Sequence, residues 1–214
     1  MRLVPNADWR RTAGAAAVIC LVGGALVWCG TDGFRALTSE QARRLAVAAS
    51  PRAIPRVDLE DQDGRPFALD SYRGRPLLVD FVYTRCRSVC PLLSDAFQRV
   101  DRVAQSTSAA DGGERLQLVS ITFDSLDTPV DLRAYAKHYS ADGRAWRFAR
   151  VREPRELESL LRAFQVVVIP DGRGDFQHNA AFHVLNAEGR LARVLDPDAR
   201  PSVIARAAEA TAPR

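Results

Sequence analysis

Residues 77–91 read Leu77-Leu78-Val79-Asp80-Phe81-Val82-Tyr83-Thr84-Arg85-Cys86-Arg87-Ser88-Val89-Cys90-Pro91. The apolar run 77–83 predicts a buried strand, and the segment from Pro91 to about Gln105 predicts a helix. This order of strand, loop and helix places both cysteines at a helix N-terminus, where backbone N–H groups and the helix dipole stabilise a thiolate. Two adjacent thiols of this kind can exchange disulfides or hold a soft metal ion.

Strands and helices alternate along the rest of the chain. Further strands are expected at 116–123, 146–151 and 166–169, further helices at 127–139, 154–164 and 201–210, and loops at 106–113 and 171–177. Hairpins are predicted around Asp61-Gln62-Asp63-Gly64 and around Asn186-Ala187-Glu188-Gly189. The order predicts an α/β, thioredoxin-like fold with an extra N-terminal β-hairpin.

The composition is that of an ordinary globular protein. Of the 214 residues, 47% are hydrophobic and 26% are charged, and the formal net charge is only +4. The arginines are scattered rather than clustered, so we expect no nucleic-acid partner. Cys20 and Cys29 lie in an N-terminal apolar stretch, which leaves Cys86 and Cys90 as the only cysteine pair of the globular part. A disulfide scaffold is therefore excluded.

The N-terminal segment has the properties of a transmembrane helix. Residues 12–31 carry no formal charge, and twenty helical residues span about 30 Å, the thickness of a bilayer core. Arg10 and Arg11 favour a cytoplasmic N-terminus. Three alternatives fit less well. A cleaved signal peptide would need a cleavage site after Trp28, and no suitable one is present; a lipoprotein signal would need a small residue before its cysteine. A buried core helix would leave the arginine pair unexplained. An uncleaved single-span anchor fits best.

Three regions follow from these patterns. Residues 1–31 are expected to form the transmembrane anchor, 32–54 a stalk or linker, and 55–214 the thioredoxin-like domain. The positive-inside rule then predicts a single-pass protein of the inner, cytoplasmic membrane with its globular domain in the periplasm.

The cysteine spacing alone leaves metal binding and redox chemistry both open. Cys-x-x-Cys is typical of redox sites, whereas the extra residue between Cys86 and Cys90 favours a chelate, although a disulfide remains feasible. Thiolates combined with an imidazole select Cu(I), with Zn²⁺ as the general competitor. A three-ligand set suffices for Cu(I) but leaves a structural zinc site one ligand short.

Three motifs together resemble the Sco/SenC family of membrane-anchored thioredoxin-like copper chaperones. They are Thr84–Pro91, the Asp127-Thr128-Pro129 segment with its following helix, and the segment Gln177–Arg190. The resemblance covers about residues 55–196 and implies that Cys86, Cys90 and His178 bind a copper ion, Cu(I) or Cu(II). It also implies a metallochaperone that serves the copper-accepting subunit of a respiratory cytochrome c oxidase.

Two other functions compete with this interpretation. The first is a thiol-disulfide oxidoreductase that reduces cysteines of a periplasmic copper protein, with Cys86 and Cys90 as its redox-active pair and Cys86 as the attacking thiol. In that case the chain would be an enzyme. The second, a peroxidase with Cys86 as its thiol, lacks a proline at the expected place before Thr84.

The remaining polar residues receive structural interpretations. His183 is expected in a strand with a hydrogen-bonded ring, and His138 on a solvated helix surface. Asp127 is expected to cap a helix, Asp124 to support the metal site or a partner, and Asp80 to face the cysteine loop. One departure from the family pattern is that only Ser125 and Leu126 separate the two aspartates, where the family usually has three residues.

Overall fold

The computed structural model describes residues 7–31, 33, 38–87, 89–111 and 116–211. The chain divides into two units, residues 1–46 and 47–214. In the first unit, α1 (Ala7–Gly30) contains Arg11–Gly30, a stretch of 20 residues that is long and apolar enough to cross a membrane. The candidate span therefore lies where the sequence predicts one.

Helix α2 (Ser39–Ala49) lies across the boundary between the two units. Thr38 and Gln41 cap its start reciprocally: the Gln41 N–H donates to the Thr38 hydroxyl, and the Thr38 N–H donates to the Gln41 side chain. Glu40 then forms ion pairs with Arg43 and Arg44 one turn later. Within the segment 32–54, predicted as a stalk or linker, the chain is thus helical from Ser39 to Ala49, while residues 32 and 34–37 lie outside the described part.

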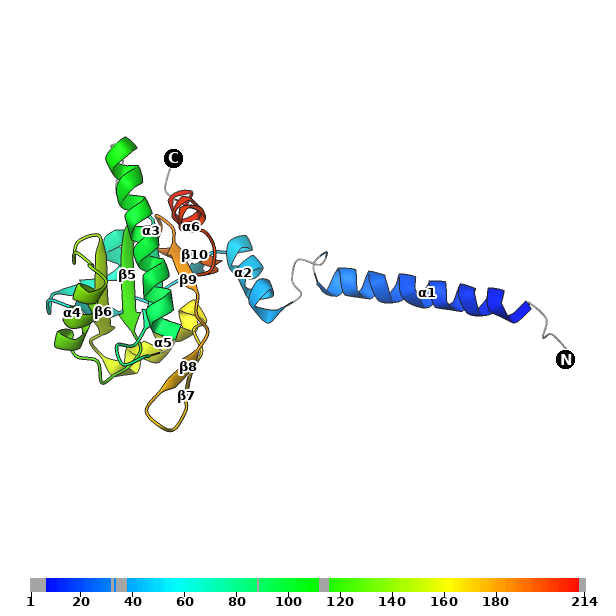
Figure 1. Cartoon of the computed structure of the whole chain (residues 1–214), viewed down its shortest axis with the longest axis horizontal. Helices are drawn as coiled ribbons and strands as arrows, with labels where there is room; N and C mark the ends of the chain where they lie inside the picture. Colours follow the sequence, from blue (N-terminus) through cyan, green and yellow to red (C-terminus); the bar gives the residue numbers. More distant parts are fainter. Residues whose placement is uncertain (1–6, 32, 34–37, 88, 112–115, 212–214) are drawn as a thin grey trace. The chain divides into compact units, whose positions relative to one another are not determined.

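The second unit is built on one eight-stranded sheet (Figure 1). Its strands are β1 (Arg52–Ala53), β2 (Asp58–Asp61), β3 (Pro66–Ala68), β4 (Leu77–Val82), β5 (Gln117–Thr122), β6 (Trp146–Val151), β9 (Phe182–Leu185) and β10 (Arg190–Leu195). The order is β1-β10-β9-β4-β5-β6-β2-β3, and only β4, β5 and β6 run parallel to one another. All six residues of β4 are buried, as expected of a central strand.

Helices cover both faces of this sheet. The helical elements are the short 3₁₀ helix η1 (Leu69–Tyr72), α3 (Val89–Asp111), α4 (Pro129–His138), α5 (Pro154–Phe164) and α6 (Pro201–Glu209). Trp146 on β6 meets Phe97 of α3, and Phe148, on the same face, meets Tyr135 of α4. Phe81 on β4 points to the opposite face, where it meets Phe164 of α5.

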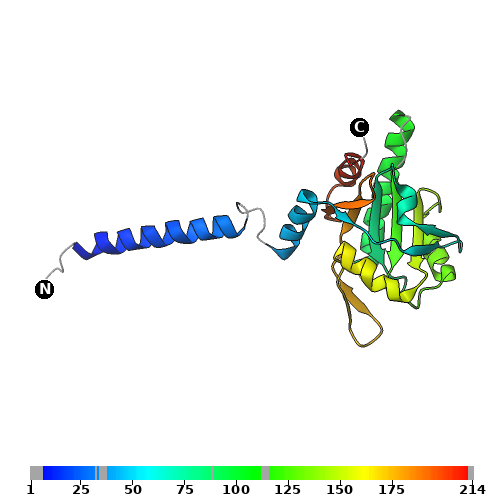
Figure 2. The same ribbon diagram turned by 180° about the vertical axis from the view of Figure 1, so that it is seen from behind.

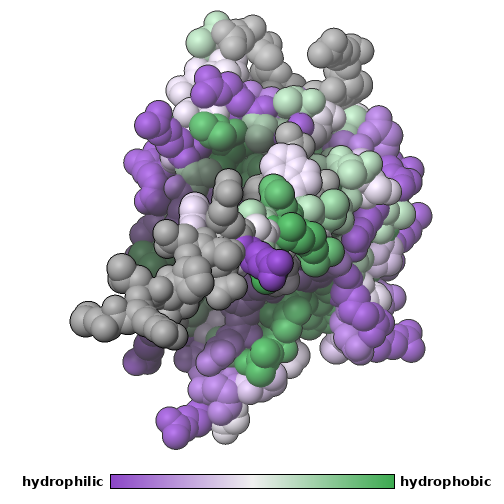
Figure 3. All heavy atoms as spheres, turned by 90° about the vertical axis from the view of Figure 1, so that its right-hand side faces the viewer, coloured by the Kyte–Doolittle hydropathy of each residue, from purple (hydrophilic) through white to green (hydrophobic). Residues whose placement is uncertain are grey.

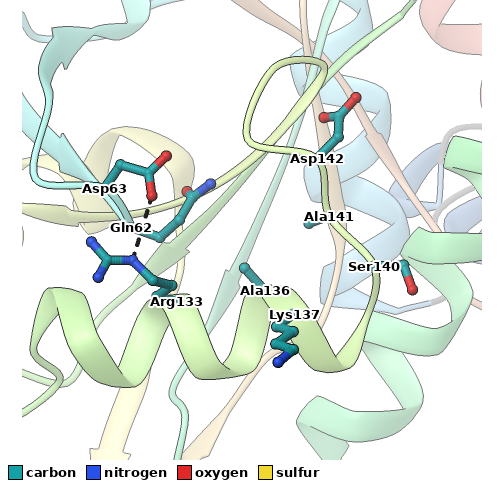
Figure 4. Close-up of a pocket in the computed structure, with 8 residues that line it drawn as sticks. All are labelled: Gln62, Asp63, Arg133, Ala136, Lys137, Ser140, Ala141 and Asp142. Carbon is teal, nitrogen blue, oxygen red and sulfur yellow. Dashed lines mark ion pairs between the residues drawn. The ribbon is translucent and has the colours of Figure 1, made fainter.

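The N-terminal hairpin β2–β3 was predicted correctly, and it is tied to the rest of the domain by polar contacts. Gln62 accepts a hydrogen bond from the Phe148 N–H at 2.9 Å, and its own N–H donates to the Phe148 carbonyl. Asp63 forms an ion pair with Arg133 of α4 at 3.4 Å, across a shallow hollow (Figure 4). The extra hairpin is therefore an integral edge of the sheet.

One predicted loop, 106–113, is wrong, and a second, 171–177, is two residues too long. Helix α3 continues through 106–111, because Ser106 and Thr107 bond back to the Val103 carbonyl and so satisfy their hydroxyls within the helix; residues 112 and 113 lie outside the described part. The expected loop 171–177 ends in β8 (Phe176–His178), which pairs with β7 (Val168–Pro170). This two-stranded sheet projects from the domain (Figures 1 and 2).

Candidate metal and thiol site

The two domain cysteines lie at the junction that the sequence predicts. Strand β4 ends at Val82, and Cys90 lies in the first turn of α3. The Cys90 N–H donates to the Cys86 Sγ at 3.3 Å, and neither cysteine forms a disulfide. This contact from a helix N-terminus stabilises negative charge on the Cys86 sulfur.

The cysteines differ in their access to solvent. Cys86 is 7% exposed and lines an open hollow, whereas Cys90 is fully buried. Burial raises the pKa of the Cys90 thiol strongly, with smaller contributions from Cys86, Asp80 and Asp127. Cys90 is therefore a protonated thiol near neutral pH, and any metal that binds its sulfur must displace that proton.

Asp80 is fully buried in the centre of β4. Strand alternation places its side chain on the face that α3 covers, opposite to Phe81. Burial raises the pKa of Asp80 to about 7; Ser120, its register partner on β5, opposes this rise, although neither carboxylate oxygen reaches a partner in regular hydrogen-bond geometry. The prediction that Asp80 faces the cysteine segment agrees with its influence on Cys90.

His178 comes close to the cysteines from a distant part of the sequence. It lies on β8 rather than in a loop, and its Nε2 is 3.7 Å from the Cys90 Sγ. Its ring packs edge-on against Phe123, at 5.0 Å between centroids. Burial lowers the pKa of His178, which favours the neutral imidazole that a metal ion requires.

An aromatic cluster holds the hairpin that carries His178. Phe176 packs against Tyr83 at 5.2 Å and against Phe123 at 5.6 Å between ring centroids. The Tyr83 hydroxyl donates to Asp175, directly before β8. This cluster was not predicted from the sequence, although Phe176 and His178 have the alternation typical of a strand.

Asp127 does not cap α4 as expected. Thr128 is the N-cap residue, in a reciprocal capping box with Asp131. The Asp127 carboxylate instead accepts hydrogen bonds from the Thr84 N–H at 2.9 Å, from the Thr84 hydroxyl and from the Thr122 hydroxyl. It therefore ties the cysteine loop to the end of β5, because two strand ends of a parallel pair meet at that edge.

Asp124 supports the same loop by a different contact. It forms an ion pair with Arg85, whose Nε lies 3.1 Å from the carboxylate, and it also accepts from the Leu126 N–H at 2.9 Å. The shortened Asp124–Asp127 segment thus keeps both carboxylates buried and both directed to the residues immediately before Cys86.

The other two histidines lie away from the thiols. His183 is buried on β9 between the rings of Phe81 and Phe164, on the face that α5 covers. His138 is exposed near the end of α4, in agreement with the expected surface position.

The three predicted ligands are thus neighbours but do not form a closed metal cage. Within the described residues, no group of three or more His, Cys, Asp or Glu side chains is arranged to hold a metal ion as it stands. The close contact between Cys90 and His178, with Cys86 bonded to the first turn of α3, is the geometry that is observed.

Comparison with known proteins links this arrangement to one family. The SCO1/SenC family model matches residues 48–212. A copper-binding protein of Stutzerimonas stutzeri is 30% identical over 145 residues, which cover 65% of this chain and 67% of that protein.

Solved structures share the fold. ScoI of Bradyrhizobium japonicum with copper bound superimposes with a TM-score of 0.62 at 22% identity, covering 74% of this chain and 99% of ScoI. BsSco, described with a disulfide switch as a member of the Sco family of cytochrome c oxidase assembly proteins, gives a TM-score of 0.66 at 20% identity, covering 76% and 95%. These likenesses confirm the thioredoxin-like fold.

Proposed function

Because this chain belongs to the SCO1/SenC family, we propose that it is a copper carrier in which Cys86, Cys90 and His178 bind the ion. The observation that carries the proposal is the 3.7 Å approach of the His178 Nε2 to the Cys90 Sγ, across 88 positions of sequence. Two thiolates and a neutral imidazole suit Cu(I), which is stable with three ligands. The copper-binding relative and the copper-bound ScoI structure support the choice of ion.

The proposed recipient is the copper-accepting subunit of a respiratory cytochrome c oxidase. Its support is the family membership, together with the description of BsSco as an oxidase assembly protein. A three-ligand centre leaves a position open for a ligand from the recipient, which allows the ion to pass by ligand exchange. We place the carrier domain in the periplasm, held by α1 in the inner membrane, because Arg10 directly precedes the span and Arg11 is its first residue.

Copper titration of the reduced protein tests the ligand set. Because Cys20 and Cys29 are also free thiols, the titration is made in a Cys20→Ser/Cys29→Ser background. We expect one tightly bound copper ion per chain. Cys86→Ser, Cys90→Ser and His178→Ala should each weaken its binding at least tenfold, by loss of a ligand.

The matched control is His138→Ala, which removes an exposed imidazole from the end of α4 and should leave the affinity unchanged. Binding that survives His178→Ala but fails in either cysteine variant would reduce the site to a dithiolate. Absence of any copper binding above micromolar affinity would overturn the carrier function.

A thiol-disulfide oxidoreductase is the second candidate, favoured by the unequal burial of the two sulfurs. Cys86 is the more accessible thiol and Cys90 is directly behind it, which suits attack by one and resolution by the other. The disulfide switch identified in BsSco supports this kind of chemistry at a paired cysteine site. Turnover of a dithiol–disulfide substrate by copper-free protein, lost in Cys86→Ser, would support this function.

A further inference from the structure

The surface around Cys86 has both charge and exposed apolar groups. An open hollow of about 520 Å³ lies beside the thiol, lined by Thr84, Arg85, Cys86, Arg87, Arg173, Gly174 and Asp175. It runs between the cysteine loop and the tip of the β7–β8 hairpin, two segments that meet only in the folded chain. Three of its seven residues are arginines.

These arginines are not equivalent. Arg85 is neutralised by its ion pair with the buried Asp124. Arg87 and Arg173 are exposed, and neither forms an ion pair within the part of the chain that the structure describes. The one acidic residue of the hollow, Asp175, already accepts from the Tyr83 hydroxyl and the Phe176 N–H. The hollow therefore presents two cationic groups that lack internal counter-charges.

Exposed apolar side chains lie on the segments that hold the two cysteines. Val89 and Leu92, in the first turn of α3 on either side of Cys90, are 47% and 69% exposed. Leu126 is 68% exposed and lies between the two aspartates that hold the cysteine loop. The projecting lower end in Figure 3, which the β7–β8 hairpin forms in Figure 1, likewise carries hydrophobic and hydrophilic side chains side by side.

We propose that Arg87, Arg173, Val89, Leu92 and Leu126 form a docking surface for a protein with an acidic face around its own cysteine pair. An apolar centre with a charged rim is the usual composition of a transient protein interface. Charge complementarity selects the occupant: a second copy of this chain would bring the same two arginines against each other, whereas a carboxylate rim would pair with them. The proposal rests on the proposed function, since it concerns the recipient of the same site.

Disulfide exchange provides a copper-free test of this surface. The Cys86 thiolate attacks one sulfur of a disulfide-containing probe, forms a mixed disulfide and releases one probe thiolate. The Cys90 thiol then loses its proton, attacks the Cys86 sulfur and releases the second probe thiolate. Two electrons pass from the protein dithiol to the probe, and the two protons of the protein thiols pass to the probe thiolates through water.

The probes are two synthetic peptides with the same internal Cys-x-x-x-Cys disulfide, one flanked by glutamates and the other by lysines. They are reacted with the reduced full chain, carrying Cys20→Ser/Cys29→Ser, in a zwitterionic detergent. At about 50 mM salt we expect the acidic peptide to react roughly tenfold faster than the basic one, and the difference to shrink at high salt. Arg87→Glu/Arg173→Glu should reverse the preference.

The matched control is Arg99→Glu/Arg102→Glu, which makes the same change of charge on exposed positions further along α3. It should retain at least half of the preference for the acidic peptide. Equal rates with the two peptides, or equal effects of the two double variants, would overturn the docking surface. The docking surface would also be overturned if anionic phospholipid vesicles competed with the acidic peptide and if Arg87→Glu/Arg173→Glu abolished that competition. That result would assign the surface to lipid.

The readout separates this proposal from the copper carrier. Loss of copper binding with an intact charge preference would refute the carrier and keep the surface. Normal copper binding without a charge preference would refute the docking surface and keep the carrier.

Discussion

At the scale of single residues, the site depends on carboxylates whose roles local sequence patterns do not predict. Asp127 precedes Thr-Pro at a helix start, and that pattern favours capping. Thr128 takes the cap instead, because its hydroxyl and the Asp131 carboxylate satisfy each other, and this frees Asp127 to bind Thr84 and Thr122. Only the parallel pairing of β4 and β5 brings those threonines within reach, and no local pattern encodes it.

Asp127→Ala should loosen the cysteine loop. It leaves the Thr84 N–H, the half-buried Thr84 hydroxyl and the buried Thr122 hydroxyl without their acceptor, so we expect a loss of about 2–3 kcal/mol in the free energy of unfolding and weaker copper binding. Denaturant unfolding and copper titration measure the two effects. Asp131→Ala, the control, should cost about 1 kcal/mol through the capping box and leave the copper affinity unchanged.

Asp80 should make the stability of the domain depend on pH. Its pKa rises from 3.8 in the unfolded chain to about 7 in the fold, so the folded state holds a proton that the unfolded state loses. The contribution of protonated Asp80 to the stability of the fold is complete below pH 4, declines as the pH rises towards 7, and is absent above that.

Asp80→Asn should therefore stabilise the protein above pH 7, by up to about 4 kcal/mol, the equivalent of that pKa difference. It should change the stability little at pH 4. Denaturant unfolding at pH 4 and pH 8 measures both values. A gain of the same size at both pH values would show that Asp80 is not protonated by its burial.

At the scale of elements, the central strands and most helices could be predicted, whereas of the β7–β8 hairpin only the first strand, expected at 166–169, could. Long apolar runs such as 77–82 and amphipathic segments such as 154–164 carry strong periodicity, and both elements lie where they were expected. The strands of the hairpin have three residues each, and Gly172 and Gly174 read as an open loop. The position of His178 relative to the cysteines could be inferred only from family resemblance.

Phe176→Ala should weaken copper binding more than it weakens the fold. Phe176 contacts Tyr83 and Phe123 and so fixes β8, yet β8 belongs to a sheet separate from the main one. We expect roughly a tenfold loss of copper affinity, as for residues that orient a ligand, with a much smaller shift of the unfolding midpoint.

Val167→Ala is the matched control, because Val167 directly precedes β7 and is largely exposed. It should change neither the copper affinity nor the unfolding midpoint. A copper affinity unaffected by Phe176→Ala would mean that the imidazole is positioned by other contacts.

At the scale of the whole molecule, the two units differ in what they contain. The first contains the candidate span, and the second contains the hydrophobic core together with Cys86, Cys90 and His178. We therefore expect residues 47–214 to fold without the first unit and to bind one copper ion with the affinity of the full chain. Gel filtration, thermal unfolding and copper titration of this fragment measure these properties.

The same division predicts where each form is found in the cell. The full chain should partition with the membrane fraction and resist extraction by carbonate, while the fragment secreted by a cleavable leader should be soluble. If expression of the full-length gene instead yields a soluble protein that is shortened by about thirty residues, a cleaved leader is indicated.

The unequal burial of the two sulfurs has a consequence for the order in which the two thiolates would release a bound ion. Cys90 is fully buried, whereas Cys86 lines the open hollow. An incoming sulfur that enters through this hollow would meet Cys86 first, so the buried Cys90 thiolate would be the last ligand to release the ion. Until that moment the ion of the proposed carrier would remain attached to the donor, and it would never need to be free in water.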